Sequence, residues 1–225
     1  LLRRIIKETC SRHGYEATFM AKPFLEETGN GMHLHISVYD DEEKNIFATT
    51  SRYGNDYLKS AIAGLQSTFY DSFPIFIPNR NGYRRIKAGN FVPVNTSWSW
   101  NRRDVSLRIP AGSNKAKRIE HRAASADANP YLVLACVLAG LHNGLTNKLR
   151  PTNFVNFDNT KGADSIVDDE MPTNLESSLN KFQNSNLLSK YFGKEYLDLY
   201  TSTKLGEIEH MSSSFIPKEE YDFYL

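Results

Sequence analysis

Residues 29–37 read GNGMHLHIS, and this stretch decides the local fold. After the glycines, apolar and polar residues alternate, which is typical of a half-buried β-strand. His33, His35 and Ser37 then share one face, and the two imidazoles lie roughly 6.5–7 Å apart along the strand. Glycine lets a backbone turn tightly or approach a ligand closely. The stretch therefore fits either a turn that leads into a strand or a metal site beside a ligand-binding loop.

The segment RIEHR, residues 118–122, shows a second alternating pattern. On a strand, Arg118, Glu120 and Arg122 share one face, and Ile119 and His121 share the other. Two flanking arginines would lower the pKa of the Glu120 carboxyl and keep it ionised. An ionised carboxylate suits Mg²⁺ or Mn²⁺ as a ligand. The same pattern is compatible with a simple ladder of surface charges.

Positive charge is concentrated between residues 80 and 122. Guanidinium groups at this density suit bidentate binding of carboxylate or phosphate. Two alternatives are a solvated, salt-bridged surface and a nucleic-acid surface with Trp98 and Trp100 as stacking platforms. The two tryptophans alternate at strand spacing, however, which favours core or rim positions. The arginines are Arg80, Arg84, Arg85, Arg102, Arg103, Arg108, Arg118 and Arg122.

The remaining patterns predict a mixture of strands and separate helices. Helical periodicity covers residues 1–12, 56–70, 127–145, 174–193 and 194–211, with Asp127 or Asn129 as the N-cap of the third. Strands are expected at 15–20, 32–40, 92–100, 105–110 and 118–122. Because strands and helices do not alternate in a βαβ rhythm, the expected fold class is α+β. The apolar run 131–141 is too short to span a bilayer and is typical of a buried helix.

Composition narrows the class of protein. The chain has 225 residues, 40% of them hydrophobic and 24% charged, as in globular proteins. A net charge of +1 gives no general attraction to nucleic acid or anionic membranes, so any charged ligand must meet a local cluster. Two cysteines, Cys10 and Cys136, are too few for a disulfide framework, which favours a reducing, cytoplasmic compartment.

Six ordered motifs together resemble the glutamine synthetase family. They are ATFMAKPF (17–24), GNGMHLHIS (29–37), NGYRRIKAGNFVPVN (81–95), NRRDVSLRIP (101–110), KAKRIEHR (115–122) and DANPYLVLA (127–135). The resemblance covers nearly the whole chain and matches the C-terminal part of that family's catalytic domain. It implies an antiparallel curved sheet with flanking helices. It also implies that a small N-terminal domain and the first catalytic strands, with further metal carboxylates, precede residue 1.

The resemblance implies a ligase reaction. Members of the family use ATP and two divalent metals, Mg²⁺ or Mn²⁺, to convert glutamate into a γ-glutamyl phosphate, which an amine or ammonia then attacks. Phosphoryl transfer of this kind needs metals and cationic side chains to offset charge on the transferring group. The family forms stacked rings with active sites between subunits, so a homo-oligomer is expected. The C-terminal EEYDFYL, residues 219–225, is a candidate contact with a neighbouring subunit.

The resemblance also assigns roles to individual residues. His33 and Glu120 match ligands of the metal that bridges the ATP phosphates. The backbone of Gly29, with Arg85 and Arg122, matches the glutamate site. Arg103 and Arg108 match arginines on the nucleotide phosphates or the transferred phosphoryl group. The nucleotide side is matched by His35, Ser37, Lys115 and Arg118.

Two departures from the family pattern concern substrate choice. The family has Pro-Gly-Tyr/Phe-Glu-Ala-Pro where this chain has AGNFVP, residues 88–93, here called the flap. The flap glutamate, which helps bind and deprotonate ammonium, is replaced by Phe91. An aromatic side chain removes the proton acceptor, which favours the γ-glutamyl-polyamine and γ-glutamyl-amine ligases of the family. Thr28, where an Asn commonly precedes the glycine, affects recognition of the amino acid.

Four functions remain open from the sequence. The leading hypothesis is an ATP-dependent γ-glutamyl-amine ligase, with the 225 residues inactive on their own. An ammonia-using glutamine synthetase with an unusual flap is the near alternative. A catalytically inactive homologue with a structural or regulatory role is the third. A zinc hydrolase that uses His33 and His35 is the fourth, but it needs further ligands, and no other histidine has a companion spacing.

Overall fold

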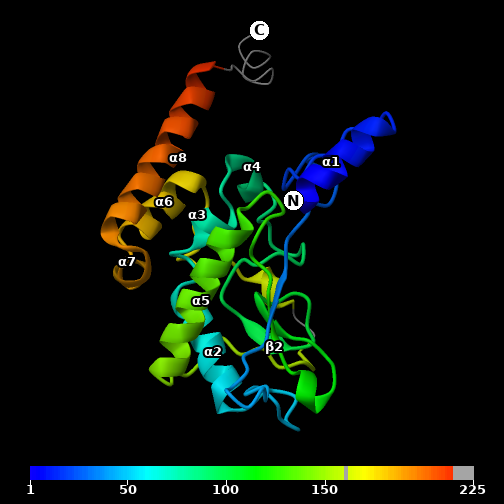
Figure 1. The fold of residues 1–225 in the computed structure, drawn as a ribbon, viewed down its shortest axis with the longest axis vertical. Helices are drawn as coiled ribbons and strands as arrows, with labels where there is room; N and C mark the ends of the chain where they lie inside the picture. The colour runs from blue at the N-terminus through cyan, green and yellow to red at the C-terminus, as the bar shows by residue number, and fades with distance from the viewer. Residues whose placement is uncertain (160–161, 215–225) are drawn as a thin grey trace.

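The structure is a computed structural model that describes residues 1–159 and 162–214. It combines a small sheet with helices, which confirms the α+β class (Figure 1). The strands are β1 (Leu34–Ile36), β2 (Trp98–Trp100), β3 (Leu107–Ile109) and β4 (Ile119–His121). The helices are α1 (Leu2–Arg12), α2 (Asp56–Ser67), α3 (Phe73–Phe76), α4 (Arg80–Tyr83), α5 (Pro130–Thr146), α6 (Leu175–Gln183), α7 (Asn186–Phe192) and α8 (Lys194–Ser214), with short 3₁₀ turns η1 (Asn114–Ala116) and η2 (Ala163–Ser165).

The sheet is mixed, in the order β1-β4-β3-β2. Strand β4 pairs antiparallel with β1 and β3, as expected, but β2 pairs parallel with β3. The prediction of an antiparallel sheet is therefore wrong for this pair. The reason is the connection at residues 101–106, which returns the chain beside β2 instead of reversing it in a hairpin. Asn101 enters that loop with a left-handed φ of 51°, and an Arg102–Asp104 ion pair lies within it.

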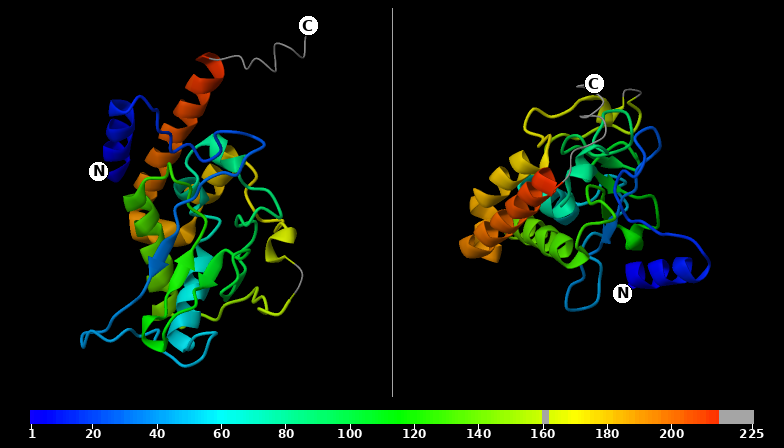
Figure 2. Two further views of the ribbon diagram at one scale, coloured as in Figure 1. Left: turned by 90° about the vertical axis from the view of Figure 1, so that its right-hand side faces the viewer. Right: turned by 90° about the horizontal axis from the view of Figure 1, so that it is seen from above.

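The two faces of the sheet have different environments. Leu107, Ile109 and Ile119 are fully buried on one face, in the hydrophobic core. Next to Ile119, the His121 ring contacts Phe76 at a centroid distance of 4.7 Å. Helices α2 and α5 lie behind the strands (Figure 2). The opposite face is therefore left for the polar side chains that alternate with the core residues.

Helix α5 is a core helix, as its apolar sequence predicted. Asn129 caps its N-terminus by accepting a hydrogen bond from the Tyr131 N–H. It crosses α2 closely because both helices present glycine: a Cβ at Gly64 would lie 2.0 Å from the carbonyl oxygen of Gly140. None of the helices in the described part of the chain is long and apolar enough to cross a membrane.

Two expected elements differ in the structure. Residues 15–20 form no strand, and the helix expected at 174–193 divides into α6 and α7. The division falls at Ser185, whose hydroxyl accepts from the Leu188 N–H at 3.1 Å and donates to Asp71 at 2.5 Å. Ser185 thus caps α7 locally and also binds a distant residue, and helical periodicity reveals neither bond. Residues 219–225 lie outside the described residues.

Candidate functional site

The polar face of the sheet brings His35, Arg108 and Glu120 side by side. Glu120 of β4 lies opposite His35 of β1 on one side and opposite Arg108 of β3 on the other. Alternation along each strand directs these side chains away from the core, where Leu107 and Ile119 are buried. The strand register therefore sets the geometry of the site, as it does for any cross-strand cluster.

Glu120 is the centre of this cluster. Its carboxylate accepts from Arg122 Nη1 at 2.6 Å and Arg108 Nη1 at 2.7 Å, and it lies 3.1 Å from His33 Nδ1. Only 2% of the residue is exposed. Burial alone would raise the pKa of Glu120, but the hydrogen bonds from His33 and Arg108 and the charges of both arginines hold it well below its usual range. Glu120 is therefore an ionised carboxylate in a cationic setting.

The expected lowering of the Glu120 pKa is confirmed, but only one of the two arginines that flank it in the sequence contributes: Arg122 binds the carboxylate, and Arg108 takes the place expected of Arg118. Arg108 is the direct cross-strand neighbour of Glu120, whereas Arg118 Nε donates to His35 Nδ1 at 3.1 Å. Burial lowers the pKa of His35; the charge of Glu120 opposes this shift, and the charges of Arg118 and Arg108 add to it. The ring is therefore neutral, accepts at Nδ1 and carries its proton at Nε2.

His33 and Glu120 form a partial donor set for a divalent cation. An imidazole nitrogen and a carboxylate oxygen converge there, and both are ordinary metal ligands. No group of three or more His, Cys, Asp or Glu side chains able to hold a metal occurs among residues 1–159 and 162–214. The pair fits the cation that the sequence resemblance implies, but further ligands must come from elsewhere. His33 and His35 have no third companion in the described chain for a zinc site.

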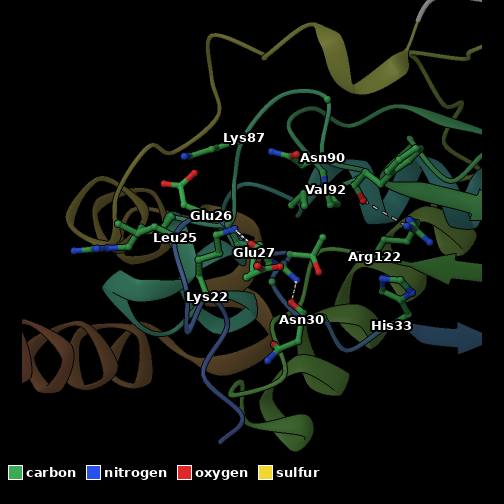
Figure 3. Close-up of a pocket in the computed structure, with 18 residues that line it drawn as sticks. Lys22, Leu25, Glu26, Glu27, Asn30, His33, Lys87, Asn90, Val92 and Arg122 are labelled. Carbon is green, nitrogen blue, oxygen red and sulfur yellow. Dashed lines mark hydrogen bonds between the residues drawn. The ribbon is translucent and has the colours of Figure 1, made fainter.

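A cavity of about 520 Å³ opens beside this cluster (Figure 3). His33 and Arg122 lie at one end of it, and Lys22 and Lys87 lie toward the other. Its walls come from the loop 22–31, the helix end at 84–87, the flap and Arg122. Among the sequence-predicted residues, the cavity is lined by Gly29, His33, Arg85, Phe91 and Arg122.

Arg85 holds the glycine loop in place. Its Nη1 donates to the carbonyl oxygen of Asn30 at 2.6 Å, and its Nη2 donates to that of Ala123 at 2.5 Å. Burial lowers its pKa to about 10. A Cβ at Gly29 would lie 2.6 Å from the Ala21 carbonyl oxygen and 3.0 Å from Arg85 Cγ, so only glycine fits there. Both terminal nitrogens of Arg85 thus bind backbone in this structure.

The flap covers one side of the cavity. Phe91 is 65% exposed and has a left-handed φ of 55°. Its N–H donates to Asp164 Oδ2 at 2.8 Å, and its carbonyl oxygen lies 3.5 Å from Arg122 Nη2. An exposed aromatic ring therefore lies at the cavity wall, and both the N–H and the carbonyl oxygen of its residue make contacts.

Some predicted site residues lie outside the cavity. Arg103 and Lys115 are exposed, and neither lines it. Ser37 donates to the carbonyl oxygen of Lys117 at 3.3 Å. His35, which binds Arg118, also lies outside the cavity lining, as does Arg118. Arg103 lies in the loop between β2 and β3, away from the segment 113–118 that carries Lys115 and Arg118.

Several residues at the cavity were not predicted from the sequence. Lys22, Glu26, Glu27 and Asn90 line the cavity, and Asp164 contacts the flap. Lys22 lies inside the motif ATFMAKPF and could have been found there. Asp164 gave no signal, because it belongs to an acidic loop 73 residues from Phe91.

Comparison with known proteins identifies the family. Residues 1–224 match the family described as glutamine synthetase, catalytic domain. The chain belongs to the glutamine synthetase family.

The similar members of the glutamine synthetase family include two γ-glutamyl-amine ligases as well as glutamine synthetases. The chain is 35% identical to gamma-glutamylputrescine synthetase PuuA of Escherichia coli (strain K12) over 92% of its own length and 43% of that protein. It is 33% identical to glutamate–isopropylamine ligase of a Pseudomonas species, covering 98% of this chain and 48% of that protein. It is 34% identical to glutamine synthetase of Methanocaldococcus jannaschii, covering 90% of this chain and 46% of that protein. The chain spans about half the length of these relatives.

Proposed function

We propose that this chain is the C-terminal catalytic part of an ATP-dependent ligase that joins the γ-carboxyl of glutamate to a primary amine or polyamine. A γ-carboxylate oxygen attacks the γ-phosphorus of ATP, ADP leaves, and a γ-glutamyl phosphate forms. The amine nitrogen then attacks the acyl carbon, phosphate leaves, and the nitrogen loses a proton. Family membership supports the reaction class. The flap supports the choice of amine.

The residues at the sheet have distinct roles in this proposal. Arg108 and Arg122 offset charge near the phosphoryl group and the glutamate, and they keep Glu120 ionised. His33 and Glu120 would supply two ligands for a Mg²⁺ or Mn²⁺ ion, which would offset negative charge on the ATP phosphates. The neutral His35, with Ser37, Lys115 and Arg118, lies on the nucleotide side. Arg103 reaches the phosphates from its exposed loop.

The glutamate site occupies the cavity in this proposal. Arg122 meets the substrate directly, together with the backbone around Gly29. Arg85 contributes by holding the loop of Gly29 against the segment that carries Ala123, because its terminal nitrogens are bound to Asn30 and Ala123. Rigid support of this kind keeps binding groups within the short distances that catalysis requires.

Phe91 carries the preference for an amine over ammonia. The position offers no carboxylate to bind ammonium or to take its proton, and the ring is 65% exposed at the cavity wall. An apolar ring can pack against the methylene chain of an alkyl amine, which ammonium lacks. Recognition of the carbon chain would then replace recognition of the small cation.

Steady-state turnover of the full-length protein tests this proposal. We expect kcat/KM with putrescine, spermidine or ethanolamine to exceed that with ammonium. Phe91→Glu should shift the ratio toward ammonium by roughly 10-fold or more, since a carboxylate restores a proton acceptor. Tyr57→Glu, at an equally exposed aromatic on α2 outside the cavity, should leave the ratio unchanged. A far higher kcat/KM with ammonium in the wild type would overturn the amine preference.

The same assay separates the remaining alternatives. Turnover with ammonium alone would identify a glutamine synthetase, consistent with its 34% identity to the archaeal enzyme. No turnover with any acceptor would identify an inactive homologue. We also expect the 225-residue chain alone to be inactive, because its described residues supply only a partial metal site, and the full-length protein to assemble as a ring-type homo-oligomer.

A further inference from the structure

The flap adopts a backbone that needs external support. Phe91 has a φ of 55°, a left-handed conformation that is uncommon for an aromatic residue and persists only where the surroundings hold it. Gly89, two residues earlier, has a φ of 77°, which glycine adopts freely. The position of the Phe91 ring therefore depends on the contacts that fix its peptide groups.

Asp164 in η2 supplies two of those contacts. Its side-chain Oδ2 accepts from the Phe91 N–H at 2.8 Å, and its backbone oxygen accepts from the Gly89 N–H at 3.1 Å. Asp164 is only 5% exposed. A carboxylate buried to this degree forms strong hydrogen bonds to backbone N–H groups.

The loop that carries Asp164 is itself held by contacts with Asp104. The neighbouring Ala163 N–H donates to Asp104 Oδ2 at 2.7 Å, and Asp104 pairs with Arg102 at 2.9 and 2.5 Å. Arg102 also donates to the Asn156 carbonyl oxygen at 3.1 Å. The loop that carries Asp164 is thus anchored to the loop between β2 and β3.

The base and the tip of the flap are held by different residues. Asn95 Nδ2 donates to the carbonyl oxygens of Ala163 and Ile166 at 2.7 and 2.9 Å, and the Asp168 N–H donates to that of Val94 at 3.0 Å. These bonds lie at or beyond the end of the flap. At the tip, the Phe91 N–H is bound by Asp164 and its carbonyl oxygen faces Arg122.

We propose that Asp164 is a positioning residue that fixes the tip of the flap, and thereby sets the shape of the site where the acceptor amine binds. This inference rests on the proposed function for its kinetic consequence but not for its structural one. The Asp164 carboxylate acts through the Phe91 backbone and does not touch a reacting atom. Arg122 contacts the carbonyl oxygen of Phe91, in the next peptide unit, and also binds Glu120, so it connects the flap to the charged cluster.

Hydrogen–deuterium exchange on the full-length protein tests the structural part. Asp164→Ala should speed exchange of the Phe91 amide by about tenfold or more, because its hydrogen bond to the side-chain carboxylate is lost. The Gly89 amide binds the backbone oxygen of residue 164, which alanine keeps, so its exchange should change less. Asp164→Asn retains an acceptor oxygen and should restore much of the protection. Asp169→Ala, at an exposed acid five residues away, should change nothing at the flap. Unchanged flap exchange in Asp164→Ala, or no rescue by Asp164→Asn, would overturn the proposal.

Kinetics on the same variants test the functional part. Asp164→Ala should raise KM for the acceptor amine by about tenfold, with KM for ATP close to wild type, since only the flap side is loosened. Equal increases in both constants would indicate general damage and overturn the positioning role. If the protein turns over no amine while flap exchange still responds to Asp164, the proposed function fails and the contact stands. If amine turnover is strong while flap exchange is the same in wild type and Asp164→Ala, the positioning role of Asp164 is wrong and the proposed function stands.

Discussion

Arg108 Nη1 lies 2.7 Å from Glu120 Oε2, across the antiparallel pair of β3 and β4. The Arg108 side chain is 16% exposed and that of Glu120 is 3% exposed, so the pair is shielded from water. Arg122 binds the other carboxylate oxygen at 2.6 Å. A single carboxylate thus compensates two largely buried guanidinium groups, which makes Glu120 important for stability as well as for the metal site proposed above.

Glu120→Gln should lower the free energy of unfolding by about 3 kcal/mol, because both arginines lose their charge partner while remaining largely buried. The low pKa of Glu120 in the folded state means that its contribution is complete above the unfolded pKa of about 4.3 and is lost as pH falls below it. Denaturant unfolding at pH 7 measures the effect. Glu42→Gln, whose partner Lys44 is equally exposed, should change little. Equal losses in both variants would contradict the prediction.

Gly144→Ala should destabilise the crossing of α2 and α5. A Cβ at Gly144 would lie 2.1 Å from the Ser60 carbonyl oxygen, so the helices must separate, at a cost of about 1–3 kcal/mol. Gly206→Ala on the exposed side of α8 meets no atom within 4 Å and should instead stabilise by about 0.5–1 kcal/mol. Thermal unfolding of the two variants measures this difference. Similar melting temperatures for both would show that the helix crossing is not tightly packed.

Local patterns predicted the faces of the sheet correctly. Alternation in GNGMHLHIS and RIEHR placed Ile119 in the core and Glu120 on the polar face, because side-chain direction along a strand depends only on neighbouring residues. The N-cap at Asn129 was among the predicted candidates for the same reason. Short-range rules suffice wherever the determining contact lies within a few residues.

Contacts between distant segments could not be predicted from the sequence. The choice of Arg108 over Arg118 as the partner of Glu120 depends on the register of β3 against β4. The parallel pairing of β2 with β3 depends on the path of residues 101–106. Asp164 reaches Phe91 across 73 residues. Each is decided by tertiary packing, for which a single sequence carries no periodic signal.

The two cysteines should differ sharply in reactivity. Cys136 is fully buried in α5, and burial raises its pKa to about 12, whereas Cys10 on α1 is partly exposed. The thiolate is the reactive species, so iodoacetamide at pH 8 should label Cys10 in the native protein and Cys136 only after unfolding. Peptide mass spectrometry measures both sites, and Cys10→Ser should abolish native labelling. Native labelling of Cys136 would show that α5 opens readily.

Asp71→Asn should stabilise the protein at neutral pH. Burial raises the pKa of Asp71, so its ionised form is disfavoured in the folded state. Stability from this group is therefore greatest below the unfolded pKa of about 3.9 and is lost as pH rises toward the folded value. Asparagine keeps an acceptor for the Ser185 hydroxyl, which caps α7, without the charge. The gain in melting temperature over wild type should thus be present at pH 7 and fade near pH 4.

The pH dependence distinguishes this cause from a general packing effect. Asp41→Asn, in the polar loop at 40–44 where the carboxyl is exposed, provides the control and should show no such pH-dependent gain. Calorimetry of the three proteins between pH 4 and pH 7 gives the required curves. A difference between Asp71→Asn and wild type that stays constant over this range would show that the carboxyl's ionisation does not oppose folding, and that the Ser185 contact alone determines the effect.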